Sequence, residues 1–165
     1  MFDDAVLIAL GSSLAGRFRS REALLEAALD DFPAAGLKLA KRSAWWRSAS
    51  WPDPEQPDYL NGLALVETAL SPHHLLAALG RIEAAFGRRH EAPNAPRTLD
   101  LDLIAYGRTV LDEPGLTLPH PRAHERLFVM GPLAEIAPEW RHPVTDESAR
   151  ELAASASVGL DARPA

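Results

Sequence analysis

The sequence predicts an α+β fold of the ferredoxin-like, split βαβ type, in which helices pack on an antiparallel sheet. The first observation is the order of the apolar patterns, which runs strand–helix–strand–strand–helix–strand. The second is the length of 165 residues, which suits one domain with a proper core. The third is that no repeat or composition change divides the chain, so we expect a single domain over residues 1–165.

The first half of the chain contains strand patterns, one helix pattern and one long loop. Strands are expected over 5–10, 37–46 and 59–68, a helix over about 21–32 and a loop over 47–58. Ser20 is placed to cap the helix, because its side chain can accept a hydrogen bond from the first turn. The loop contains three prolines, which hold neither a helix nor a strand ladder.

A small-residue turn is expected directly after the first strand, from Gly11 to Arg17. Its two glycines lie five residues apart, which resembles the spacing of a phosphate-binding P-loop. That loop needs Lys followed by Ser or Thr, whereas Arg17 and Phe18 stand at those places. We therefore reject a P-loop and interpret the segment as a plain strand-to-helix connection, with a turn whose backbone approaches a ligand as the alternative.

The second half adds a long helix, an acidic strand and several shorter elements. Ser71 followed by Pro72 is a typical helix start, and an apolar stripe at i, i+4, i+7 and i+11 follows. The shorter elements are expected as an edge strand near 109–111, a short extended segment over 116–122, a helix over about 123–134, and a last helix to about 156. Thr145 or Asp146 is expected to cap that last helix, and residues 157–165 are expected to fray.

Composition excludes several classes of protein. The net charge of −6 does not suit a general nucleic-acid binder. The absence of cysteine excludes disulfides and thiolate metal sites. The N-terminus lacks the basic start and apolar length of a signal peptide, and no stretch approaches a membrane span. We expect a cytoplasmic monomer that binds small molecules rather than nucleic acid or membranes.

The segment 95–104, APRTLDLDLI, carries the strongest chemical signal. As a strand it places leucines on one face and both Asp100 and Asp102 on the other. Side chains at i and i+2 stand roughly 7 Å apart, and such carboxylates can share two divalent cations about 3.5–4 Å apart. The alternative is an amphipathic strand with two solvated aspartates. Aspartate is disfavoured in strands, however, and adjacent carboxylates repel unless a cation compensates them.

Basic and aromatic residues elsewhere extend this signal. Arg97 precedes the aspartates, and a loop with Arg88 comes before it, while His120 and Arg126 follow. Divalent metal with several arginines suits phosphoryl or nucleotidyl transfer, in which catalysis is mostly positioning and charge neutralisation. The proline-rich loop carries Trp51 and leads into a strand that begins with Tyr59 and contains Asn61; such groups suit a flat heteroaromatic second substrate.

In these motifs and their order, the chain resembles the hydroxymethyl-dihydropterin pyrophosphokinase family of the folate pathway. Residues 95–104 resemble the family signature almost throughout, and 57–61, 87–88, 118–120 and 125–128 also match. The resemblance runs from residues 5–12 to 133–138. It implies transfer of pyrophosphate from ATP, the co-substrate, to the hydroxymethyl group of 6-hydroxymethyl-7,8-dihydropterin, with AMP as the other product. It also implies a ferredoxin-like α+β fold, in agreement with the apolar patterns.

The resemblance also implies roles for individual residues. Asp100 and Asp102 match the aspartates that hold two Mg²⁺ ions. The residues that match the triphosphate-binding and catalytic set are Arg88, Arg97, His120 and Arg126. Those that match the pterin pocket are Tyr59, Asn61 and Phe128. Trp51 stands where the family commonly has proline or leucine, and we expect it to contact the substrate from the covering loop. The loops at about 47–58 and 89–95 match mobile loops that close over both substrates.

The chain departs from the family pattern at a few positions. Ser13, His90 and Asn94 stand where the family has Asn, Arg and Trp. These changes concern loop closure and phosphate contacts rather than the reaction. Two alternatives stay open: another magnesium-dependent transferase, such as a nucleotidyltransferase, and a non-catalytic pterin- or nucleotide-binding module.

Overall fold

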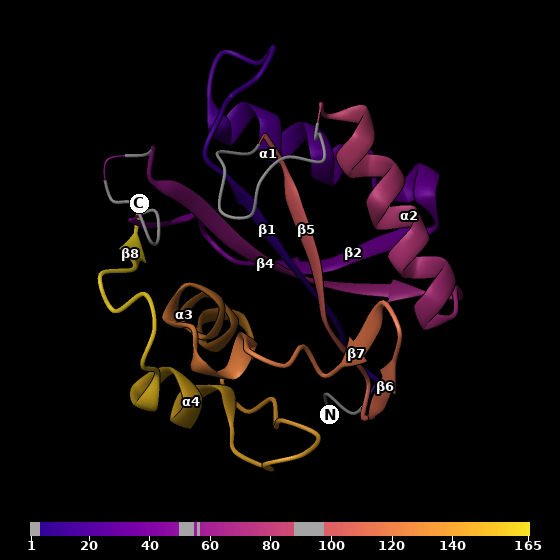
Figure 1. Ribbon diagram of the computed structural model, residues 1–165, viewed down its shortest axis with the longest axis vertical. Coiled ribbons are helices and arrows are strands. Elements are labelled where there is room, and N and C mark those ends of the chain that lie inside the picture. The colour runs from indigo at the N-terminus through magenta and orange to yellow at the C-terminus, as the bar shows by residue number, and fades with distance from the viewer. Residues whose placement is uncertain (1–3, 50–54, 56, 88–97) are drawn as a thin grey trace.

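The computed structural model describes residues 4–49, 55, 57–87 and 98–165. Within these residues it contains a six-stranded sheet, a two-stranded sheet and helices on both faces of the larger sheet (Figure 1). The elements in chain order are β1 Val6–Ser12, α1 Arg21–Asp30, η1 Pro33–Ala35, β2 Leu37–Arg42, β3 Trp46–Ser48, β4 Tyr59–Thr68, α2 Pro72–Ala85, β5 Asp100–Tyr106, β6 Leu111–Glu113, β7 Leu116–Leu118, η2 Ala123–Glu125, α3 Leu127–Ile136, α4 Ala149–Ser155 and β8 Arg163–Pro164.

The larger sheet has the strand order β5-β1-β4-β3-β8, and β2 pairs with β4 beside β3. All of these pairings are antiparallel. Helix α1 connects β1 to β2 across β4, and α2 connects β4 to β5 across β1, which is the split βαβ arrangement. The predicted ferredoxin-like α+β fold is therefore confirmed.

Both long helices start where the sequence predicted. The Ser20 hydroxyl accepts a hydrogen bond from the Ala23 amide at 3.0 Å, and the Ser71 hydroxyl accepts one from the His74 amide at 3.3 Å. These bonds satisfy amide groups that have no partner within the helix. Pro72 occupies the first turn of α2, where its missing N–H costs nothing.

The last helix starts later than predicted. Ser148 caps α4 and forms a capping box with Glu151, so neither Thr145 nor Asp146 is the cap. Both belong to the preceding turn: the Thr145 amide donates to His142 Nδ1, and Asp146 has a left-handed φ of 61°. A residue with that φ cannot take the extended backbone of an N-cap.

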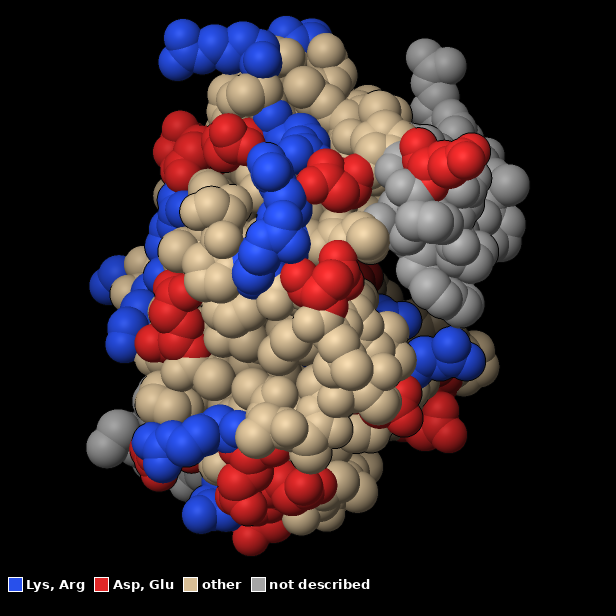
Figure 2. Space-filling model, turned by 90° about the vertical axis from the view of Figure 1, so that its left-hand side faces the viewer, with Lys and Arg blue, Asp and Glu red and all other residues tan. Residues whose placement is uncertain are grey.

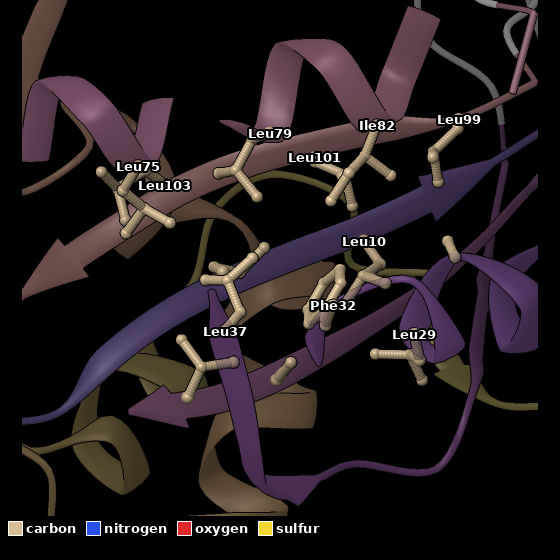
Figure 3. Packing of buried hydrophobic residues seen from close by; sticks show 14 of the residues in the cluster. Leu10, Leu29, Phe32, Leu37, Leu75, Leu79, Ile82, Leu99, Leu101 and Leu103 are labelled. Atoms are coloured by element: carbon tan, nitrogen blue, oxygen red, sulfur yellow. The ribbon is translucent and has the colours of Figure 1, made fainter. Parts of the chain in front are cut away.

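Two hydrophobic cores lie on opposite faces of the sheet. On one face, α1 and α2 cover the odd-numbered leucines of β5, as Figure 3 shows for Leu79 and Ile82 facing Leu101. On the other face, α3 and α4 cover Leu7, Leu63 and their neighbours. Burial on both faces explains the unbroken apolar run of β1.

Several other predicted elements differ from the observed ones: β5 is Asp100–Tyr106 rather than 95–104, and β6 is Leu111–Glu113 rather than 109–111. Strand β1 continues through Gly11 and Ser12, where a turn was expected. The predicted strand 37–46 divides into β2 and β3, because Ser43 leaves the pattern and bonds to both backbone groups of Leu63. The predicted helix 123–134 divides into η2 and α3, because Arg126 has extended backbone angles, φ −102° and ψ 115°.

Strand β5 contains a bulge at Ile104. Leu7 pairs with Ala105 and Ile8 pairs with Leu103, so Ile104 is the extra residue. The Ile104 carbonyl accepts a hydrogen bond from the His120 amide at 2.8 Å, which connects β5 to the segment after β7.

The C-terminal residues do not fray as expected. Strand β8 pairs with β3, and the Ala165 amide donates to the Trp45 carbonyl at 2.9 Å. On the face shown in Figure 2, the described basic and acidic side chains are interspersed. No helix among the described residues is long and apolar enough to cross a membrane.

Candidate active site

A cleft of about 440 Å³ opens on the face of the sheet that carries α3. Its floor follows from the strand register: Gly11 on β1 lies between Asn61 on β4 and Asp100 on β5. One step along, Ala9 lies beside Asp102. Large side chains at these two β1 positions would fill the space, so the small residues leave the sheet accessible to a ligand. The described lining residues are Ala9, Leu10, Gly11, Ser48, Ala49, Tyr59, Asn61, Asp100, Asp102, Ile104, Arg122, Glu125, Arg126, Phe128, Val129 and Val158.

The two aspartates form the acidic side of the cleft. They alternate with Leu101 and Leu103, which are buried in the opposite core. The Leu101 amide donates to Glu83 Oε2 on α2 at 2.8 Å. This bond gives a hydrogen-bond partner to a backbone amide at the outer edge of β5, beside the aspartates. The leucine packing and this bond therefore hold the strand that carries both carboxylates.

The donor set of this pair fits magnesium. Mg²⁺ prefers oxygen ligands and is usually bound by one or two carboxylates, with substrate phosphates and water completing the shell. Among the described residues, no group of three or more His, Cys, Asp or Glu side chains can hold a metal by itself. Asp100 and Asp102 therefore suit an ion that phosphate oxygens help to bind, rather than a closed structural site.

The aromatic side of the cleft contains Tyr59 and Asn61 from β4 and Phe128 from α3. Asn61 is only 7% exposed, and its Nδ2 donates to Ser48 Oγ at 2.9 Å. A Cβ at Gly11 would stand 3.4 Å from Asn61 Oδ1 and 3.8 Å from Tyr59 Cδ1. Glycine at this position therefore leaves room next to the amide and the phenol ring.

Two arginines line the cleft near the helix α3. Arg126 joins η2 to α3, and its guanidinium carbon lies 5.7 Å from the ring centroid of Phe128. Arg122 lies four residues earlier, at the start of η2. Their positive charges face the same cleft as Asp100 and Asp102, an arrangement suited to a ligand with phosphates and bound cations.

His120 lies next to the cleft but is not one of its described lining residues. Its Nδ1 accepts a hydrogen bond from the Arg122 amide at 3.2 Å, so the neutral ring carries its proton on Nε2. Burial lowers the pKa of His120 from 6.5 to about 4, and the charges of Arg126, Arg122 and His124 act in the same direction. The ring is therefore neutral at pH 7.

The structure brings most of the described candidate residues together. Tyr59, Asn61, Asp100, Asp102, Arg126 and Phe128 all line the one cleft. Trp51, Arg88 and Arg97 lie outside the described residues. So do the loop segments 50–54 and 89–95.

Several lining residues were not found from the sequence. Ala9 and Gly11 carried a usable signal, since two small residues alternate with large ones in an apolar strand. Ser48 and Val158 carried none, because their place depends on contacts with β4 and with η2 that are distant in sequence.

Comparison with known proteins gives the relatives of this chain. The family model described as 7,8-dihydro-6-hydroxymethylpterin-pyrophosphokinase (HPPK) matches residues 7–138. The Pseudomonas aeruginosa 2-amino-4-hydroxy-6-hydroxymethyldihydropteridine pyrophosphokinase is 39% identical over 160 residues, 96% of each chain. A Synechocystis protein of the same name is 46% identical over 118 residues, which are 72% of this chain and 60% of that protein. The chain spans only 19% of the Pneumocystis carinii folic acid synthesis protein fol1, to which it is 36% identical.

A solved structure shows the same fold. The wild-type Plasmodium falciparum HPPK-DHPS matches with a TM-score of 0.70 at 12% identity, over 91% of this chain and 44% of that chain. The family and the enzyme class predicted from residues 95–104 are confirmed by the family model and the relatives. The chain belongs to the HPPK family of pyrophosphokinases.

Proposed function

We propose that this protein transfers pyrophosphate from ATP to the hydroxymethyl group of 6-hydroxymethyl-7,8-dihydropterin, giving the pterin diphosphate and AMP. The observation that carries the proposal is that one cleft contains a carboxylate pair and an aromatic–amide pocket, separated by Gly11. This arrangement suits two substrates side by side, one with phosphates and one with a flat ring.

In the reaction, the hydroxyl oxygen of the pterin attacks the β-phosphorus of ATP. A new P–O bond forms, the bond from the β-phosphorus to the α–β bridging oxygen breaks, and AMP leaves with the electron pair. The hydroxyl proton passes to solvent. The chain's part is to align the attacking oxygen with the phosphorus and to balance the charge of the phosphates.

On the phosphate side, Asp100 and Asp102 would hold two Mg²⁺ ions, which when bound neutralise and orient the phosphates. Arg126 would add a charge-assisted contact, and we propose the same for Arg88 and Arg97. In the protein without ligand, burial and nearby arginines lower the pKa of His120 to about 4, so the neutral ring would offer a hydrogen-bond donor from Nε2.

On the pterin side, Tyr59 and Phe128 would contact the two faces of the ring, with Trp51 in the covering loop. Asn61 has one amide hydrogen fixed on Ser48, which leaves its second amide hydrogen and its carbonyl oxygen for the amide-like edge of a pterin. Aromatic faces with one buried amide are what such a ring requires.

Phosphorus NMR of the protein with ATP, magnesium and the pterin alcohol tests the proposal. We expect signals of AMP and of a pterin diphosphate. Release of inorganic pyrophosphate would instead indicate a nucleotidyltransferase, and pterin binding without ATP consumption would indicate a binding module. Asp102→Asn is a suitable control, because it keeps the side-chain shape and removes the charge.

A further inference from the structure

The C-terminal segment, residues 157–165, lies beyond the family match, which ends at residue 138. In Figure 1 it is the yellow chain that leaves α4, passes α3 and ends as β8 beside β3. Figure 2 views the molecule from the side on which β8 lies. The segment therefore contacts two elements, α3 and β3, that line or border the cleft from different sides.

The first contact is with the ring of Phe128. Gly159 has a left-handed φ of 68°, and a Cβ on it would stand 2.5 Å from Phe128 Cδ1 and 3.0 Å from Cε1. The Gly159 backbone thus lies directly against the ring, at a distance that only glycine permits. Phe128 is half-buried, so this contact limits where its ring can move.

The second contact is with the start of α3. The amides of Ser157 and Val158 both donate to the Glu125 carbonyl at 3.0 Å, and the Leu127 amide donates to the Val158 carbonyl at 2.9 Å. No described side chain caps α3, so the Val158 carbonyl satisfies an amide that a cap would otherwise serve. Phe128 follows immediately in the chain.

The third contact is with the end of β3. Asp161 Oδ2 accepts a hydrogen bond from the Ala49 amide at 2.7 Å. Ser48 and Ala49 both line the cleft, and Ser48 is the partner of Asn61. The same short segment thus contacts Ala49, the chain neighbour of the residue that bonds the Asn61 amide, and the ring of Phe128.

We propose that the C-terminal segment sets the geometry of the pterin side of the cleft, with Gly159 and Asp161 as positioning residues. The proposal rests on the proposed function, because it assigns the pterin pocket to this side. A flat ring between two aromatic side chains tolerates little change in their separation, whereas the carboxylates on β5 do not contact the segment in any described interaction. Pterin affinity should therefore depend on the segment more than ATP affinity does.

The first test compares Gly159→Ala with Gly115→Ala. Gly115 also has a positive φ, 84°, but open space around it, so this control reproduces the backbone strain without the collision. Pterin binding is followed by fluorescence titration and binding of a non-hydrolysable ATP analogue with magnesium by calorimetry. We expect Gly159→Ala to weaken pterin binding by about tenfold, which is about 1.4 kcal/mol, because the added methyl group must displace the Phe128 ring. The affinity for the ATP analogue should change by less than about twofold, which is under about 0.5 kcal/mol.

The second test uses Asp161, which is exposed and so does not endanger folding. Asp161→Ala should raise KM for the pterin severalfold with little change in KM for ATP, and Asp161→Asn should restore it, because an amide oxygen still accepts from Ala49. Asp30→Ala removes the same charge on α1 and should change neither constant.

Three outcomes overturn the proposal. The first is unchanged pterin binding in Gly159→Ala and Asp161→Ala. The second is an equal loss of affinity for the pterin and for the ATP analogue. The third is a loss of pterin affinity with Gly115→Ala as large as that with Gly159→Ala. If the wild-type protein itself binds no pterin, the proposed function fails instead, so the two failures are distinguishable.

Discussion

The two faces of the sheet are built from the same strands, but one face is a filled core and the other contains the cleft. On the face under α1 and α2, large side chains fill every layer, and Leu101 is 4% exposed. On the face under α3, the core stops at the cleft, where β1 contributes Ala9 and Gly11, while the side chain of Leu10 packs in the opposite core. Strand β5 takes part in both, with leucines on one side and aspartates on the other. Stability and chemistry are therefore separable by substituting alternate residues of one strand.

The largest expected effect concerns the aspartates. Asp100→Ala or Asp102→Ala should lower turnover by about 10³-fold or more, because each would remove a carboxylate ligand from the Mg²⁺ ions proposed to bind the phosphates. The thermal unfolding transition should remain cooperative, since the packing comes from the leucines. Turnover near the wild-type value at ordinary magnesium concentration would show that the acidic face is not the site.

The reciprocal change concerns the other face. Leu101→Ala should lower the free energy of unfolding by about 2–5 kcal/mol, because it leaves a cavity under α2 (Figure 3). Urea unfolding measures this loss, with Asp102→Ala as the matched neighbour. A smaller loss in Leu101→Ala than in Asp102→Ala would contradict the division of roles between the faces.

Asn61→Leu should weaken pterin binding more than ATP binding. The substitution nearly keeps the volume, but it leaves polar atoms of the ligand buried without partners, at about 1–3 kcal/mol each. It also removes the bond to Ser48. Separate titrations with pterin and with an ATP analogue provide the comparison, and normal pterin affinity would place the pocket elsewhere.

A further prediction is a pH dependence of stability. The pKa of His120 is about 4 in the folded protein and 6.5 in the unfolded chain, so the unfolded chain binds more protons between these values. Stability should therefore be complete above pH 6.5 and fall as the pH drops towards 4. Burial also lowers the pKa of His142, which acts in the same direction. Urea unfolding at several pH values measures the slope, and His120→Gln should reduce it.

The sequence predicted those features that depend on local chemistry. Ser20 and Ser71 were recognisable as caps because each acts within its own helix. The alternation in residues 95–104 predicted the two faces of the acidic strand because alternation is local as well, but not its bounds, which are Asp100–Tyr106. The cap of α4 was wrongly placed although Ser148 and Glu151 have the capping-box spacing, since Thr145 and Asp146 offered the same chemistry nearby.

The features that could not be predicted depend on distant partners. The C-terminal segment has no periodicity of its own, and it is ordered by backbone bonds to η2 and β3. Arg126 breaks the predicted helix at the point where that segment pairs with it. The role of Ser48 follows only from its hydrogen bond with Asn61, which joins the neighbouring strands β3 and β4. These interactions exist only once the sheet has formed.

The bulge at Ile104 has a consequence for how β5 tolerates insertions and deletions. Before the bulge, odd-numbered residues face α2; after it, Ala105 packs with the α3 core and Tyr106 packs towards α2. The extra residue thus shifts the alternation by one position, so the acidic half and the final half of the strand are out of phase. Deleting Ile104 would place Leu103 next to Ala105, two residues that already face opposite sides of the sheet and pair with consecutive residues of β1. The strand could then alternate regularly with every remaining side chain on its present face, so β5 should tolerate this deletion.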